Sequence, residues 1–288
     1  MNGLRNILGV ARYERIMLMR TLRFRVVGLA GIALPIFLGI VLGILEARGL
    51  ESGTTFGIGA FIPFYVYSFL QAVVVAFLAG DFRAADERAN VYEVIAVRPL
   101  STTELVVGKY LGVLQALASL CLVVMLITMA IHGAKLSVLG TPFRLEPYLG
   151  YFFIMTLPGL IFMAALTFFL GALLRNRAAV ALVVIAYIIG VLFFLGDRYG
   201  GIFDFGAFYA PLFYSDMHGF GDLTRVIEIR LFYMALAVAL LGLSVARYPR
   251  LPQAGFWRLA GWGAVVAGGL AAAGLLGWMR QQDAASLD

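Results

Sequence analysis

The sequence predicts an all-α membrane protein in which seven helices cross the bilayer. Hydrophobic residues make up 62% of the 288 residues and charged residues only 13%, which is about half the charged content of a soluble domain. A helix needs about 20 apolar residues to cross a hydrocarbon core, and seven runs without charged side chains come near that length or exceed it. These runs are 26–45, 56–80, 110–134, 147–174, 178–196, 231–246 and 259–279.

The composition excludes several classes of function. The loops between the runs are too short for a separate catalytic or nucleotide-binding domain, so energy has to come from another chain or from an ion gradient. The runs contain no carboxylate of the kind that proton relays and sodium sites use. The lone Cys121 and the distant His132 and His218 form no metal cluster and no nucleophile-base-acid set. We therefore expect no catalytic residue, no metal site and no cofactor in this chain.

The segment before the first run, residues 4–25, combines apolar side chains at helical spacing with six arginines. This pattern predicts an amphipathic helix that lies in the inner membrane interface. A plain basic anchor that only sets the orientation of the chain fits the same residues, since arginine stems reach the headgroups in either case.

The basic residues are distributed unevenly over the predicted topology. With a cytoplasmic N-terminus, 15 of the 22 Lys and Arg residues fall on the cytoplasmic side and 7 on the other side. Cytoplasmic loops are enriched in Lys and Arg, so we expect the N-terminus inside, the C-terminus outside, and a location in a plasma membrane such as the bacterial inner membrane. The same rule accounts for the net charge of +6, without a nucleic-acid partner.

The loop 81–104 between the second and third runs is the most highly charged part of the chain, with eight charged residues. Its pattern predicts a short helix that ends before Pro99, followed by a capping box at Ser101 and Glu104 that begins the third span. Composition alone favours an ordinary solvated loop. The alternative is a preformed knob that docks in a groove of a cytoplasmic partner.

Residues 81–109 resemble the corresponding region of ABC-2-type transporter permeases. In that family an acidic and basic cluster follows the second span, and then come a short helix, a proline with a small or hydroxyl residue after it, and a Gly-Lys pair. The residues whose order and spacing fit this pattern are Glu87, Arg88, Glu93, Pro99, Ser101, Gly108 and Lys109. The resemblance implies that the coupling to the ATPase subunit involves Asp86, Glu87, Arg88, Tyr92, Glu93, Arg98, Pro99, Gly108 and Lys109.

The resemblance implies a permease domain over residues 1–250, with an N-terminal interfacial helix and a six-helix ABC-2-type bundle. It also implies two copies of an ABC ATPase subunit, which bind ATP and Mg, and a second copy of this permease or a homologue. The Gly108-Lys109 pair is not a phosphate loop. That motif needs glycine at position 103 and serine or threonine at position 110, and the sequence has Thr103 and Tyr110. We expect Lys109 to reach the inner headgroups instead.

Polar residues in the second and fifth runs are candidates for a translocation path, since these spans line the permease interface in proteins of this architecture. They are Tyr67, Gln71 and Tyr187. Ordinary hydrogen bonds between helices, worth about 0.6 kcal/mol each, are the alternative.

The segment 197–228 contains eight aromatic residues, which favours short interfacial or re-entrant helices on the outer side. Such a segment serves either as an outer gate or as an aromatic belt.

The last run lies outside the resemblance, so residues 251–288 form an additional transmembrane helix with a short outer tail. Trp262 and Trp278 bracket small residues that favour close packing on this bundle or on a partner. These small residues are Gly263, Ala264, Ala267, Gly268, Ala271, Ala272 and Gly274.

Two functions follow from these expectations. The first is a permease subunit that couples ATP hydrolysis in a separate subunit to export of an unidentified substrate. The second is a membrane subunit of an ABC complex that transmits motion to an external accessory protein without transporting a small molecule. Membrane lipid is an expected partner in both.

Overall fold

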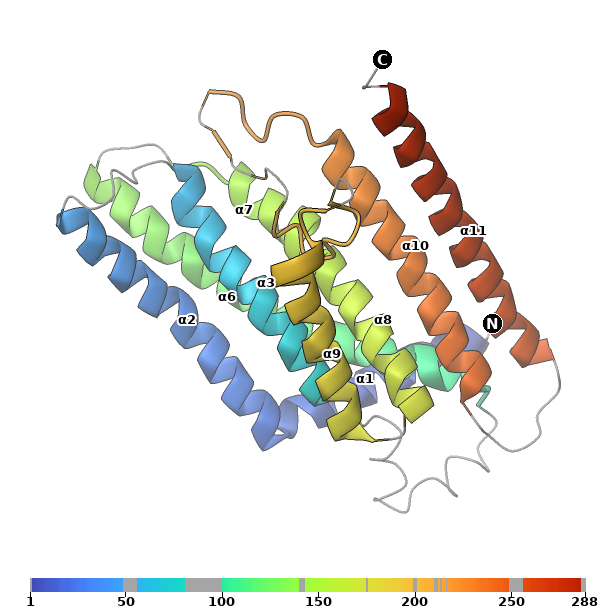
Figure 1. Ribbon diagram of the computed structural model, residues 1–288. Helices are drawn as coiled ribbons and strands as arrows, with labels where there is room; N and C mark the ends of the chain where they lie inside the picture. The colour runs from blue at the N-terminus through green and yellow to red at the C-terminus, as the bar shows by residue number, and fades with distance from the viewer. Residues whose placement is uncertain are drawn as a thin grey trace.

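The computed structural model describes residues 2–48, 56–80, 100–139, 143–174, 176–198, 201–209, 212, 214–215, 217–248 and 256–285. In this part of the chain the regular elements are helices (Figure 1). They are α1 (Asn2–Arg20), α2 (Leu22–Ala47), α3 (Phe56–Ala79), α6 (Thr102–Leu139), α7 (Glu146–Gly150), the π-helix η1 (Tyr151–Thr156), α8 (Leu157–Leu174), α9 (Arg177–Gly190), the π-helix η2 (Val191–Leu195), α10 (Thr224–Arg247) and α11 (Phe256–Ala285).

Seven helical stretches in the described residues are long and apolar enough to cross a membrane. They lie in α2, α3, α6, α7–η1–α8, α9–η2, α10 and α11, and these segments cover the seven runs predicted from the sequence to within one residue. The chain is therefore an all-α, multi-pass membrane protein, as predicted.

The helices surround α8, which contacts α3, α6, α9 and α10. Figure 1 shows α2 and α11 at opposite edges of the bundle. Both helices bury little of their surface within the chain, and many of their large apolar side chains are exposed. In a membrane these two faces meet lipid or another protein.

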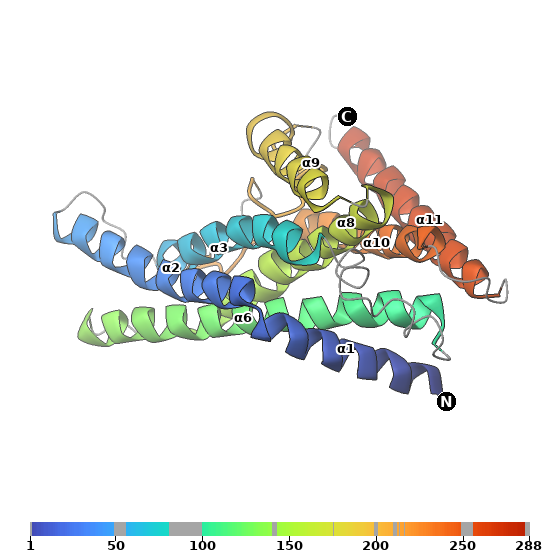
Figure 2. The same cartoon turned by 90° about the horizontal axis from the view of Figure 1, so that it is seen from below.

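The N-terminal helix ends earlier than the predicted boundary at residue 25. Thr21 separates α1 from α2, because its hydroxyl donates to Leu18 O at 2.7 Å and accepts from Phe24 N at 3.2 Å. The second bond caps the start of α2. On the two sides of this break, α1 and α2 both lie alongside α6, as Figure 2 shows.

The sixth span is longer than the predicted run of 16 residues, since α10 has 24 residues. The predicted run begins after Arg230 because a charged side chain in hydrocarbon is costly. In the structure Arg230 is buried and donates to backbone carbonyls of the 201–209 segment, so the helix continues through it.

The seventh helix packs on this bundle, through α10. The two helices are antiparallel, and their backbones approach at glycines: a Cβ added to Gly268 would lie 2.6 Å from Ala235 O, and one added to Gly242 would lie 2.7 Å from Gly261 O. Ala272 is also buried, whereas other predicted small residues are exposed. These exposed residues are Gly263, Ala267, Ala271 and Gly274.

We predict that Gly268→Leu separates α11 from α10, because a side chain there meets the backbone of α10. Overpacking of this kind costs about 1–3 kcal/mol, and the melting temperature in detergent should fall. The matched control is Gly269→Leu, since a Cβ on Gly269 meets nothing within 4 Å. Equal melting temperatures for the two variants would contradict the observed packing.

Candidate functional site

The start of α6 is fixed by the predicted capping box. Ser101 N donates to Glu104 Oε2 at 2.9 Å, and Glu104 N donates to Ser101 Oγ at 3.1 Å. Both side chains are buried, and a Cβ added to Gly3 of α1 would lie 3.1 Å from Glu104 Oε1. The first turn of α6 therefore lies against the first turn of α1.

Two glycines of α6 let α1 approach it closely. A Cβ added to Gly108 would lie 2.6 Å from Val10 Cβ, and one added to Gly112 would lie 2.7 Å from Ala11 O. Their spacing of four residues places both on one face of α6, in the small-xxx-small pattern that lets membrane helices pack closely. No larger residue fits at either position without moving α1.

Lys109 is buried between these glycines, with 5% of its surface exposed. Its Nζ lies 3.9 Å from Glu14 Oε2 of α1. The expectation that Lys109 reaches the membrane headgroups is therefore wrong, because α1 covers it and supplies a carboxylate. We call the set Gly3, Glu14, Glu104, Gly108, Lys109 and Gly112 the α1–α6 joint.

The other predicted coupling residues are Asp86, Glu87, Arg88, Tyr92, Glu93, Arg98 and Pro99, and they lie outside the described residues. The coupling helix in loop 81–104 stays a prediction. The described residues add one fact to it: the C-terminal end of that loop enters the α1–α6 joint at Ser101.

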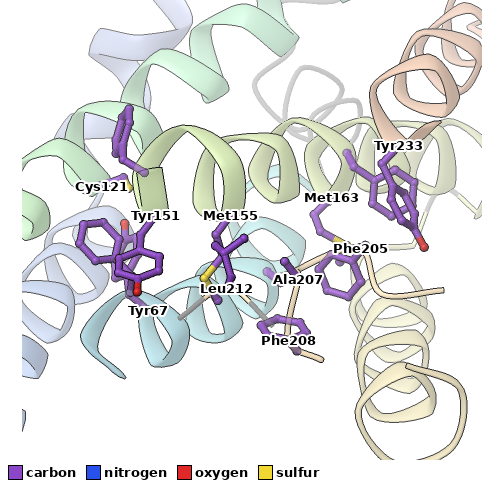
Figure 3. Close-up of a cluster of buried hydrophobic side chains, with 14 of the residues drawn as sticks. Tyr67, Cys121, Tyr151, Met155, Met163, Phe205, Ala207, Phe208, Leu212 and Tyr233 are labelled. Atoms are coloured by element: carbon purple, nitrogen blue, oxygen red, sulfur yellow. The ribbon is translucent and has the colours of Figure 1, made fainter. Parts of the chain in front are cut away.

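Two of the predicted path residues, Tyr67 and Gln71, lie in the interior of the bundle on α3. Gln71 Nε2 donates to Thr156 O at 3.4 Å, and the Ser68 hydroxyl lies 3.0 Å from Thr156 Oγ1. Within the described residues Gln71 Oε1 has no hydrogen-bond partner. Figure 3 shows Tyr67 beside Tyr151 of η1.

The π-helix η1 contributes to this polar cluster. It spans Tyr151–Thr156 and lies just before Pro158, which has no amide proton for a helical hydrogen bond. Its widened turn lets Thr156 Oγ1 donate to Tyr151 O at 3.2 Å. Single π-turns inside α-helices are frequent at functional sites, and the sequence pattern does not predict this one.

Tyr187, the third predicted path residue, has different neighbours. It lies on α9 and packs against Phe162 of α8 and against Phe205, with ring centroids 6.2 and 5.6 Å apart. Tyr187 therefore belongs to the contact between α8, α9 and the 201–209 segment, whereas Tyr67 and Gln71 face η1.

Most of the described residues between 197 and 223 form turns and bends, with Gly201 in a 3-10 conformation. We call residues 201–209, 212 and 214 the plug. Phe205, Phe208, Leu212 and Tyr214 are buried in the core cluster, and Figure 3 shows the plug against Met155 and Met163. Aromatic residues of the segment thus fill one end of the bundle.

Asp204 and Arg230 hold the plug in place. The Asp204 carboxylate accepts from Phe208 N and Tyr209 N, each at 2.8 Å. Arg230 Nη2 donates to Asp204 O at 2.7 Å, and Nη1 donates to Phe205 O. These bonds also hold Ala207 at a positive φ of 56°, a conformation that costs a residue with a Cβ roughly 1–2 kcal/mol.

Burial raises the pKa of the Asp204 carboxyl, and the Tyr209 amide, the Arg230 guanidinium and the Phe208 amide partly oppose this rise. Neither Asp204 nor Arg230 is among the site residues predicted from the sequence. The available signals were an arginine at the edge of an apolar run and an aspartate among aromatic residues.

No family model matches this sequence, and a comparison with curated proteins gives no significant match.

We predict that Gly112→Leu displaces α1 from α6. The readout is maleimide labelling of Ala11→Cys in a Cys121→Ala background, because Ala11 is fully buried. Since an overpacked contact costs about 1–3 kcal/mol, labelling should become about tenfold faster. Gly9→Leu is the control, as a Cβ on Gly9 meets nothing within 4 Å. Slow labelling in Gly112→Leu would contradict the close approach.

We also predict that Arg230→Met loosens the plug, because it leaves the carbonyls of Asp204 and Phe205 buried without these donors. Each such loss costs about 1–3 kcal/mol. Hydrogen exchange of the amides in 201–209 should accelerate about tenfold. Arg247→Met, at the exposed opposite end of α10, should leave exchange unchanged. If both variants exchange like the parent, Arg230 does not hold the plug.

Proposed function

We propose that this chain is the transmembrane permease subunit of an ATP-driven ABC transporter. ATP is hydrolysed in a separate nucleotide-binding subunit, and this chain couples that hydrolysis to export of an unidentified substrate. The observation that carries the proposal is the α1–α6 joint, because the charged loop 81–104 enters it directly through Ser101 and Glu104.

The joint supports a coupling role because it moves two helices together. The α6 helix has 38 residues, which is about 57 Å at 1.5 Å per residue and exceeds the roughly 30 Å of a hydrocarbon core. A push on the loop end of α6 is carried along its whole length. α1 moves with it, since their backbones touch at Gly108 and Gly112.

Contacts farther along α6 extend this coupling to the plug. The Tyr110 hydroxyl donates to Ile161 O of α8 at 2.9 Å. At the other end of α6, His132 hydrogen-bonds the Tyr148 hydroxyl of α7. Glu146, also on α7, accepts from the Tyr214 hydroxyl of the plug at 2.7 Å. In the proposal the plug is the outer gate, moved from the loop through α6 and α7.

The proposed path residues are Tyr67, Gln71 and Tyr187. All three lie inside one bundle or at its edge, packed by α8, η1 or the plug. A substrate therefore passes them only when α3 and α9 separate from α8. The remaining parts of the proposal are two ATPase subunits with ATP and Mg, and a second permease copy or homologue.

Purification from the native membrane tests this proposal. An ATPase subunit with a phosphate loop should copurify with the chain. Glu87→Lys and Glu93→Lys should lower the ATPase activity of the assembled complex about tenfold or uncouple it, because reversed charges prevent docking of the loop. Asp197→Lys, an exposed residue outside loop 81–104, is the charge-matched control. Recovery without a nucleotide-binding subunit would reject the proposal.

The alternative is an ABC membrane subunit that transmits motion to an external protein. The same loop variants distinguish the two functions. In a transporter they also abolish ATP-dependent release of a small molecule from cells, whereas in a motion-transmitting subunit only the activity of the external partner falls.

We further propose that the N-terminus lies in the cytoplasm and the C-terminus outside, in a plasma membrane such as the bacterial inner membrane. The basic residues of α1 and the odd number of spanning helices in the described residues support this orientation. A C-terminal alkaline phosphatase fusion, active only outside the cytosol, should be active. An inactive fusion that is present at normal levels would contradict the proposed orientation.

A further inference from the structure

An open, apolar groove lies on the membrane-facing side of the bundle, between α2 and α6, beside the end of α1. Its volume is about 650 Å³, and Met19, Phe24, Leu29, Leu120 and Val123 are among its lining side chains. Gly28 also lines the groove, and the absence of a side chain there keeps it open.

The groove has one charged end, where Arg25 lines it one turn of α2 before Leu29. Ile32 lies seven residues after Arg25, which is about 10 Å farther along the axis of α2 at 1.5 Å per residue. The one hydroxyl in the lining, Ser119, donates to its own helix at Ala116 O. A ligand therefore meets a cation at one end and apolar side chains along the rest.

The surroundings of the groove are strongly basic. Residues 2–45 contain six arginines and one acidic residue, Glu14, which lies against Lys109 in the α1–α6 joint. Arg20 and Arg25 are exposed, and among the described residues the ion pairs do not include either of them. This end of the groove is therefore suited to an anionic group.

We propose that the groove binds one anionic phospholipid. One acyl chain lies along Leu29, Ile32, Leu120 and Val123, and the phosphate contacts Arg25 with Arg20 nearby. The position fits a lipid, because the candidate membrane span of α2 begins at Leu22 and Arg25 lies within its first turn. Basic segments at a membrane surface attract anionic lipid.

Charge disfavours a second copy of this chain as the occupant. A two-fold contact presents the same surface on both subunits, so the arginines of one copy would face those of the other. A phospholipid instead supplies the negative charge and the apolar chain together. By filling the angle between α1, α2 and α6, it also stabilises the break at Thr21. This proposal is independent of the proposed permease function.

Native mass spectrometry of the full-length protein tests the proposal. The protein is released from micelles that contain phosphatidylglycerol or, at the same concentration, phosphatidylcholine. We expect one phosphatidylglycerol per chain and about tenfold weaker retention of phosphatidylcholine. Inorganic phosphate at equal ionic strength should not displace the lipid, because phosphate lacks the acyl chain. Equal retention of both lipids, or displacement by phosphate, would overturn the proposal.

Two variants locate the lipid. Arg25→Gln should weaken phosphatidylglycerol retention about tenfold, and Gly28→Leu should abolish retention by filling the groove. The controls are Arg48→Gln, directly after the other end of α2, and Gly43→Leu on α2, where a Cβ meets nothing within 4 Å. Unchanged retention in both test variants would overturn the assignment.

Val123→Trp narrows the groove from α6 and replaces Gly28→Leu if that variant does not fold. A disulfide between two copies of a Leu29→Cys variant in native membranes would show that a second copy covers the groove, and would also overturn the proposal.

Discussion

A charged side chain that is buried in the protein has to find its partner there, because water does not reach it. Two such sites lie at opposite ends of the bundle. Lys109 is buried against Glu14, where α1 and α6 touch. Arg230 is buried against the carbonyls of Asp204 and Phe205. The first site holds the N-terminal helix on the bundle, and the second holds the plug.

These two sites explain why each end of the helical bundle carries an additional segment, α1 at one end and the plug at the other. At one end α1 cannot leave α6 without exposing Lys109 and opening the contact at two glycines. At the other end the plug closes over α8 because a buried arginine requires its carbonyls. The polar contacts from α6 through α7 to Tyr214 link the two ends.

The arginines of α1 and α2 outnumber the acidic residues around them. Glu14 is the one acidic residue among residues 2–45, and it faces Lys109, while the ion pairs of the described residues do not include the exposed Arg20 and Arg25. This excess of positive charge lies beside an apolar groove. The proposed phospholipid supplies both a negative charge and an apolar contact at this end.

The sequence by itself determined the helical class, the seven spans and the capping box at Ser101 and Glu104, because hydropathy and capping depend on residues close together in the chain. The small residues of the last span likewise indicated close packing. Only the tertiary structure decided that Lys109 is covered by α1, that α10 continues through Arg230, and that the segment before α10 forms a plug of turns. Each of these depends on a contact between residues far apart in the sequence. In the sequence Arg230 marks one end of an apolar run. In the structure it lies within α10, because carbonyls of the distant 201–209 segment accept its hydrogen bonds.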